Sequence, residues 1–225
     1  PKGQPRIFSF LQIRPIIESV VTNNELPADF NIDDTIIYSE SALGNGTYDY
    51  IRNFVYVKPE TFNPANTRQI ASAVEKINKK FSQQDEQYIL VGPGRWGSSD
   101  PWLGIPVIWA QISSAKIIVE AGLNNFRIDP SQGTHFFQNL TSFNVGYFTI
   151  NPFMEDGFFD LDYLNKQEAC HEDEYLRHIC FKDPLTIIIE GKNNKAAIYK
   201  SGFKIIKHQE SLENSINDLP PEGFM

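Results

Sequence analysis

The sequence predicts a mixed α/β fold of the α+β kind, built on sheets. The chain has 17 Phe and 9 Tyr beside only 2 Met, a balance that favours packed sheets over helical bundles. Its 225 residues, 41% of them hydrophobic, can bury one large core or two small ones. One segment has helical spacing of its apolar residues, and several short apolar runs are typical of strands.

The first half of the chain alternates strands and a helix. Residues 35–41 and 48–58 are predicted as strands, and Gly44-Asn45-Gly46 between them suits a hairpin-like reversal. After Asn63-Pro64, apolar residues recur at helical spacing up to Phe81, which predicts a helix. Residues 87–91 then form a short strand that leads into a glycine-rich loop.

The second half is predicted to be richer in strands. Residues 106–120 fit either a helix or two strands, and the apolar run 117–119 favours a buried strand at the end. Residues 134–142 fit a short helix, and residues 145–150 fit a strand. The clearest later strands, 185–190 and 196–200, are joined as a tight hairpin.

Charge and cysteine content limit the function classes. The net charge of −8 disfavours a nucleic-acid or anionic-membrane surface. No apolar run reaches the roughly 18 residues that a membrane-spanning helix needs. Cys170 and Cys180 are too few for a disulfide framework, so a reducing, cytoplasmic setting is expected.

A strand near the start of the chain carries two polar residues on one face. Residues 6–10 alternate polar and apolar, and the strand then presents Gln12 and Arg14 together before Pro15 ends it. An amide beside a guanidinium suits a phosphate ligand. The alternative is an edge strand with two solvated side chains.

The pattern L-Q-x-R-P-I at residues 11–16 resembles the closing strand of the ATP-grasp domain of phosphoenolpyruvate synthase and pyruvate phosphate dikinase. The resemblance implies that Gln12 and Arg14 face the phosphates of ATP, with Mg²⁺ held elsewhere in the ATP-grasp domain. Most of that domain would precede residue 1, so we expect the chain to be a C-terminal piece of a larger protein and inactive alone.

A glycine-rich loop follows the predicted strand 87–91. Gly92 and Gly94 would let backbone N–H groups approach an anion, Arg95 adds a charged fork, and Ser98 adds a hydroxyl. The spacing matches neither a Walker A loop nor a dinucleotide fingerprint. The alternative is a structural Ω-like loop whose tryptophans cover a small core.

The segment Gly133-Thr134-His135 is predicted to open a helix. Free N–H groups at a helix start stabilise an anion, and Thr134 can cap the helix or bind a phosphate oxygen. The neutral imidazole of His135 is a competent nucleophile towards a phosphoryl group. The alternative is a hydrogen-bonded structural histidine.

Residues 35–150 resemble, in the order of their elements, the swivelling domain that follows the ATP-grasp domain in the same family. That domain carries a phosphorylatable histidine in a G-G-x-T-S-H-A-A motif, which implies a phosphate-relay role for His135. The sequence departs from the motif, because it has no Ser between Thr134 and His135 and has Phe136-Phe137 in place of small residues.

Two further clusters suggest metals but have simpler interpretations. Asp160 and Asp162 would share a face of a strand and could bind Mg²⁺, although such acidic clusters are more often solvated. Cys170-His171 and His178-Ile179-Cys180 offer four zinc-type ligands, but adjacent ligands are geometrically awkward. We therefore predict no metal site within the chain.

The combined prediction is a swivelling β/β/α-like domain with a β-rich C-terminal extension. The expected parts are a last ATP-grasp strand (1–16), a linker (17–34), the swivelling domain (35–150), the extension (151–209) and a loose tail (210–225). The expected function is that of an ATP-dependent phosphotransferase that acts on a small molecule such as pyruvate or phosphoenolpyruvate. The alternative is a non-catalytic docking or regulatory module behind an ATP-grasp domain.

Overall fold

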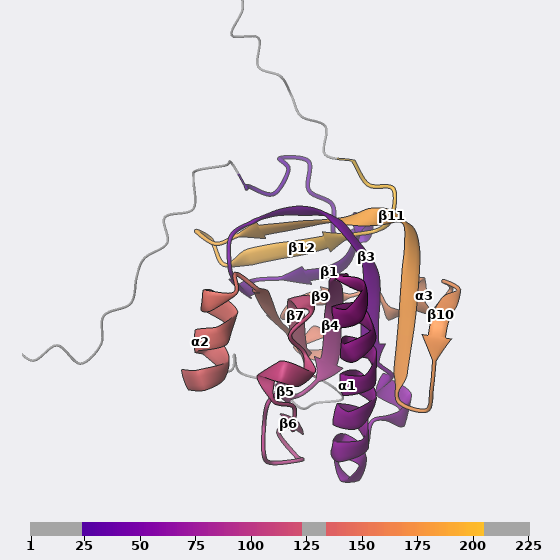
Figure 1. The fold of residues 1–225 in the computed structure, drawn as a ribbon. Coiled ribbons are helices and arrows are strands. Elements are labelled where there is room, and N and C mark those ends of the chain that lie inside the picture. The colour runs from indigo at the N-terminus through magenta and orange to yellow at the C-terminus, as the bar shows by residue number, and fades with distance from the viewer. Residues whose placement is uncertain (1–23, 123–133, 205–225) are drawn as a thin grey trace, which may run out of the picture.

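The fold of the chain is seen in a computed structural model that describes residues 24–122 and 134–204, with the backbone alone for residues 134–137. Within these ranges the chain forms a ten-stranded sheet, a two-stranded sheet and three α-helices (Figure 1). The predicted mixed α/β class is therefore confirmed. The described 3₁₀ turns are η1 (Ile32–Asp34), η2 (Pro59–Thr61), η3 (Pro64–Asn66), η4 (Trp109–Gln111) and η5 (Pro152–Met154).

Four parallel strands form one layer of the sheet. They are β3 (Gly46–Val57), β4 (Tyr88–Pro93), β7 (Ala115–Ala121) and β8 (Gly146–Ile150), in the spatial order β8-β7-β4-β3. The strands β4, β7 and β8 are buried along almost their whole length. This burial matches their nearly continuous apolar sequences, since parallel strands are normally covered on both faces.

An antiparallel layer continues the same sheet beyond β3. It contains β11 (Leu176–Glu190), β12 (Lys195–Tyr199), β1 (Thr35–Ser39) and β9 (Phe158–Phe159), and β10 (Ala169–Glu172) pairs with β11 outside this path. The strand β11 runs antiparallel to β3 and β12. Strands before and after residue 150 thus share one sheet, so the expected boundary there is not a break between sheets.

The sheet curls back on itself through the junction of β1 and β2 (Ser41–Leu43). β1 pairs with β12, whereas β2 pairs with β8 at the other end of the strand order. The Ser39 hydroxyl donates to the backbone oxygen of Thr149 at 2.8 Å, and the Ala42 N–H donates to that of Asn194 at 2.8 Å. The two layers therefore enclose a core that contains Phe54.

Two helices cover the outer side of the parallel layer. α1 (Thr67–Gln84) and α2 (Thr134–Ser142) contribute to a second core, in which Val74, Phe81 and Leu140 share a cluster with strand residues. Asp85 caps the C-terminus of α1 with a left-handed backbone (φ 54°) and an N–H that donates to the Phe81 oxygen. The short α3 (Leu161–Asn165) follows β9.

A small third cluster lies on the outer side of the antiparallel layer. Leu26 and Phe30, from the described part of the expected linker, pack there with Tyr38 and Tyr199. The Phe203 ring stacks on Tyr199 with centroids 3.9 Å apart. Residues 24–30 are therefore not a purely polar connector, because two of their apolar side chains pack against the sheet.

Most predicted helices and strands are confirmed, and the error concerns which strands pair with each other. The helix at 134–142 and the strands near 35–41, 48–58 and 145–150 are present. The prediction of a hairpin across Gly44-Asn45-Gly46 is wrong, because the flanking strands do not pair with each other: β2 pairs with β8, and β3 pairs with β4 and β11. Gly44 and Gly46 do adopt the positive φ that such a reversal uses, 113° and 144°.

Candidate functional site

The glycine-rich loop leaves the sheet at the carboxyl edge of the parallel strands. After β4 ends at Pro93, the chain forms β5 (Arg95–Trp96) and returns through β6 (Gly104–Ile105), which pairs in parallel with β5. In open α/β sheets, ligands bind at the carboxyl ends of the strands. This edge is therefore the first place to test the predicted phosphate-binding residues.

The backbone N–H groups of this loop are engaged within the protein. The N–H of Gly94 donates to Ala121 O at 3.2 Å, and that of Arg95 donates to Leu103 O at 2.8 Å. The N–H of Gly97 donates to Ile105 O at 2.8 Å. An anion cradled by these N–H groups would have to replace the internal hydrogen bonds.

The glycines of the loop are required by close packing. A Cβ at Gly92 would lie far inside van der Waals contact with the Trp96 ring, which is 1% exposed. Gly94 has φ +75°, and a Cβ there would meet the backbone of Leu103 and Gly104. This packing gives both glycines a structural role, as in the alternative interpretation of the loop.

A buried carboxylate fixes the loop to β7. Glu120 is 0% exposed, and its Oε1 accepts the N–H of Trp96 at 2.9 Å. Its Oε2 accepts the hydroxyl of Tyr147 at 2.5 Å, and the indole N–H of Trp96 donates to Val119 O at 3.1 Å. The role of Glu120 could not be predicted from the sequence, because a single acid at the end of an apolar strand gives no local sign of its partners.

The two polar side chains predicted in this loop have different surroundings. Arg95 is half-buried and lies at the start of β5. The Ser98 hydroxyl donates to Asp100 O at 3.0 Å and accepts the Asp100 N–H at 3.2 Å. Ser98 thus stabilises a local turn, which the sequence interpretation did not include.

The helix α2 begins at Thr134, as predicted, so His135 is its second residue. At the other end of the helix, Lys116 at the start of β7 donates to the Asn144 oxygen at 2.7 Å. The last turn of α2 therefore lies near the amino ends of the parallel strands. A nine-residue helix is about 13 Å long, so its first turn points towards their carboxyl edge.

Several predicted site residues lie outside the described part of the chain. Gln12 and Arg14 are among them, and so are the side chains of Thr134 and His135. The described residues thus place Gly92, Gly94, Arg95 and Ser98 at and beyond the carboxyl end of β4, and Thr134 and His135 in the first turn of α2.

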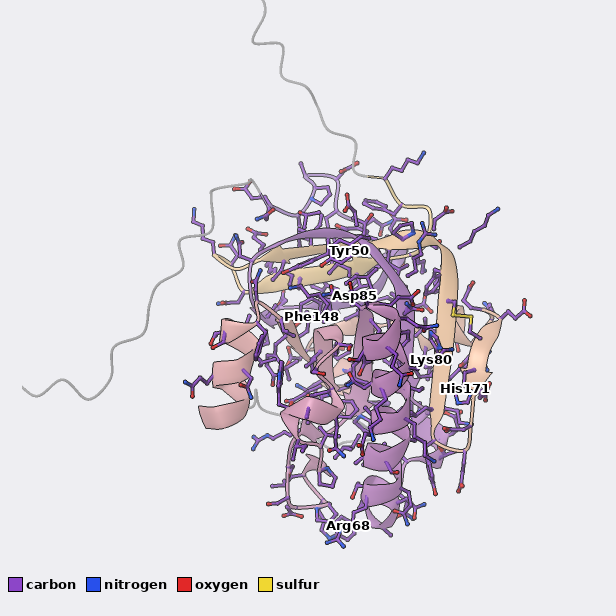
Figure 2. All side chains as sticks on the ribbon, in the orientation of Figure 1. Tyr50, Arg68, Lys80, Asp85, Phe148 and His171 are labelled. Carbon is purple, nitrogen blue, oxygen red and sulfur yellow. A yellow bond between two sulfur atoms is a disulfide. The ribbon has the colours of Figure 1, made fainter. Side chains whose placement is uncertain are left out.

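A groove of about 510 Å³ opens near the start of α1. Pro64 and Arg68 line one side, and Pro101 and Trp102 of the glycine-rich loop line the other. Figure 2 shows Arg68 and Lys80 near opposite ends of α1. The Trp102 side chain is 75% exposed, in contrast to the buried Trp96. The groove therefore combines an exposed indole with a guanidinium.

The acidic pair that was considered as a possible Mg²⁺ site has a structural role. Asp160 and Asp162 do not share a strand: Asp160 precedes α3 and accepts the Tyr163 N–H at 2.9 Å, while Asp162 lies in the first turn. Asp160 also pairs with Lys200 at 2.7 Å. Burial tends to raise the Asp160 pKa, but these bonds and nearby lysines lower it overall.

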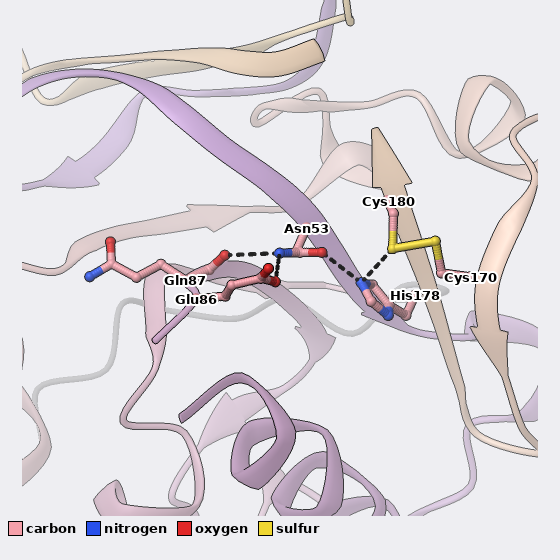
Figure 3. The surroundings of a disulfide bond; sticks show 6 residues. All are labelled: Asn53, Glu86, Gln87, Cys170, His178 and Cys180. Atoms are coloured by element: carbon pink, nitrogen blue, oxygen red, sulfur yellow. Dashed lines mark hydrogen bonds between the residues drawn. A yellow bond between two sulfur atoms is a disulfide. The ribbon is translucent and has the colours of Figure 1, made fainter. Parts of the chain in front are cut away.

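The two cysteines form a disulfide, in contrast to the reducing setting that their low number predicted. Cys170 on β10 is bonded to Cys180 on β11 (Figure 3). Their sulfurs are then not the thiolates that zinc requires. In the described residues no group of three or more His, Cys, Asp or Glu side chains could hold a metal ion. The buried His178 lies beside Cys180, at 3.3 Å from its sulfur.

No protein-family model, curated protein or solved structure matches this chain. Among residues 24–122 and 134–204, no helix has the length and apolar character to cross a membrane. The candidate functions therefore depend on the site and on the sequence resemblance.

Proposed function

We propose that this chain is part of an ATP-dependent phosphotransferase in which His135 accepts and passes on a phosphoryl group. The observation that carries the proposal is the start of α2 at Thr134, which makes His135 the second residue of the helix. The first N–H groups of a helix have no intrahelical partner. These N–H groups and the positive end of the helix dipole would stabilise a phosphate attached to His135.

The chemistry of this step needs a neutral imidazole and a good leaving group. One ring nitrogen of His135 would form a bond to the β-phosphorus while the P–O bond to the α-phosphate breaks, so that AMP leaves with the bonding pair. Hydrolysis would then release the γ-phosphate as inorganic phosphate and leave the β-phosphoryl group on His135. ATP and Mg²⁺ enter the proposal through the sequence resemblance alone. Gln12 and Arg14 would complete the nucleotide site in an adjoining ATP-grasp domain.

The topology supports the proposal. The first turn of α2 points towards the sheet edge where β4 delivers Gly94 and Arg95. We assign the Arg95 guanidinium to bind the phosphoryl group during transfer. The backbone N–H groups of the loop instead form hydrogen bonds within the protein. The site would therefore bind phosphate through side chains and the α2 terminus.

We also propose that the fold is a divergent swivelling β/β/α domain. An antiparallel layer, a parallel layer and helices on the outer side of the parallel layer match the three layers that this name describes. Strands β9 to β12, expected as a separate extension, would then be part of the domain itself.

The test uses the full-length protein that carries this sequence, incubated with Mg²⁺ and ATP labelled at the β-phosphate. The expected result is acid-labile label on the protein that His135→Ala abolishes. His171→Ala is the matched control, since His171 is half-exposed on β10 and should leave the label unchanged. Label that survives His135→Ala would overturn the proposal.

A docking module is the second candidate, and the exposed Trp102 beside Arg68 favours it. Its partner would be the ATP-grasp domain of the same protein. Trp102→Ala should weaken binding between separately expressed domains, measured by calorimetry. The matched control is Phe153→Ala, which also removes an exposed aromatic ring but lies outside the groove. Equal affinity for wild type and Trp102→Ala would reject docking at this surface.

A further inference from the structure

We propose that Cys170–Cys180 is a thiol–disulfide exchange site for dithiol reductants, in which His178 and Asn53 stabilise the thiolate of Cys180. The proposal is independent of the phosphotransferase function. It rests on the position of the disulfide and on a chain of hydrogen bonds that leads to one of its two sulfurs (Figure 3).

The disulfide is accessible from solvent. It joins neighbouring antiparallel strands with a Cα–Cα separation of 5.8 Å, and both cysteine residues are exposed. Among the described strands, β10 pairs with β11 alone. An incoming thiol can therefore reach the sulfur atoms without opening the core.

The hydrogen bonds around Asn53 fix the direction of its amide. Its Nδ2 donates to Glu86 Oε2 at 3.0 Å and to Gln87 O at 3.5 Å, so its Oδ1 faces His178. His178 Nε2 lies 3.0 Å from this Oδ1, which can only accept. The hydrogen of the imidazole is therefore on Nε2, the same atom that lies 3.3 Å from the Cys180 sulfur.

The position of His178 keeps this donor in place near neutral pH. The residue is 3% exposed, and its ring meets Phe81 of α1 edge-on at 5.2 Å. Burial, followed by the charges of Lys80 and His171, lowers the His178 pKa to about 4. The ionisable groups that face it are Lys80 from α1, Glu86 through Asn53, and His171 from β10.

Of the two sulfurs in the disulfide, that of Cys180 lies beside His178, and this difference sets the direction of the exchange reaction. A reductant thiolate attacks the sulfur of Cys170, a new S–S bond forms, and the Cys170–Cys180 bond breaks. The electron pair leaves on Cys180, and its thiolate shares the hydrogen bond of the His178 Nε2–H with Asn53 Oδ1. The second thiol of the reductant then attacks the reductant sulfur of the mixed disulfide, and the bond from that sulfur to Cys170 breaks. The reductant becomes a cyclic disulfide, and the two protons of the dithiol end on Cys170 and Cys180. Thiolate stability on the leaving sulfur speeds such exchange.

The first test uses the wild-type chain and 2-mercaptoethanol, a monothiol that needs a second molecule to resolve the mixed disulfide. After brief exposure and trapping with N-ethylmaleimide, peptide mapping should find the mercaptoethanol adduct on Cys170 and the maleimide on Cys180. We expect this pattern to exceed the reverse by about three-fold or more. Equal labelling, an excess of the reverse pattern, or maleimide on both cysteines before reductant would overturn the proposal.

The second test measures the rate of reduction by dithiothreitol in matched variants. His178→Ala should reduce several-fold more slowly than wild type, because Cys180 loses its donor. His178→Gln retains an N–H near the Nε2 position and should recover most of the rate. His171→Ala is the neighbouring control and should react like wild type. A His178→Ala variant that matches wild type in rate and adduct pattern would reject the role of His178.

Discussion

The carboxylate of Glu120 accepts the backbone N–H of Trp96 at 2.9 Å, and this bond ties the glycine-rich loop to the end of β7. Glu120 is wholly buried, and a buried carboxylate is stable only when its oxygens accept hydrogen bonds. The position of the loop and the burial of Glu120 therefore depend on each other. The loop that brings Arg95 to the carboxyl edge is thus held by the sheet.

Replacing Glu120 should destabilise the protein strongly. Glu120→Ala removes the acceptor that the Trp96 N–H and the Tyr147 hydroxyl use, and a lost buried hydrogen bond of this kind costs about 1–3 kcal/mol. We expect the free energy of unfolding to fall by about 3 kcal/mol or more in urea denaturation. Tyr147→Phe removes one donor and should cost less. Equal stabilities for Glu120→Ala and wild type would contradict this role.

The glycine at position 92 should be intolerant of a methyl group. Gly92→Ala forces its Cβ into the Trp96 ring, and overpacking of this kind typically costs about 1–3 kcal/mol. Gly202→Ala is the comparison, because at Gly202 (φ +90°) a Cβ would strain the backbone but meet no described atom within 4 Å. The fluorescence emission spectrum of Trp96 should shift in Gly92→Ala but not in Gly202→Ala. An unshifted spectrum in Gly92→Ala would argue against the contact between residue 92 and the Trp96 ring.

The antiparallel layer should lose stability in mild acid through His178. Burial holds the His178 pKa at about 4, below the ordinary value of 6.5, so the unfolded chain binds more protons between these values. This contribution is complete above pH 6.5 and disappears as the pH falls towards 4. It amounts to about 3 kcal/mol at most. His178→Gln should flatten the stability profile between pH 4 and 6.5, whereas His171→Ala should keep most of the slope, because burial is the largest cause of the lowered His178 pKa.

The disulfide should stabilise the chain by limiting the unfolded state. Its cysteines are ten residues apart, and closing a loop of this size is worth about 3 kcal/mol in the chain-entropy model. Cys170→Ser should lower the urea midpoint, and dithiothreitol should lower the midpoint of wild type but leave that of Cys170→Ser unchanged. A midpoint in wild type that does not respond to dithiothreitol would contradict the effect.

Local patterns predicted the elements well, and contacts between distant residues explain the failures. Helical spacing identified α1, and Gly133 before a polar-apolar pattern identified the start of α2. Only residues 185–190 of β11 were predicted as a strand, and Pro184, which cannot donate to a strand ladder, directly precedes them. The structure continues the strand through Pro184 with a shift of register against β3 between Cys180 and Leu185.

The site was predictable only where residues close in sequence define it. The loop at residues 92–98 and the start of α2 were identified from glycine and turn signals. The partners of Glu120 and the pairing of Cys170 with Cys180 depend on strand registers that one sequence does not specify. The same is true of the contact between His178 and Asn53, which lie 125 residues apart.

The most direct test of the phosphotransferase account is to locate the phosphate on the full-length protein after turnover with ATP and Mg²⁺. The chain has four histidines, so His171, His178 and His208 serve as internal controls for His135. Mass spectrometry under alkaline conditions, which preserve phosphohistidine, should place the modification on the peptide that contains His135 and on none of the other three. Phosphate on another histidine, or none at all with ATP bound, would contradict the account.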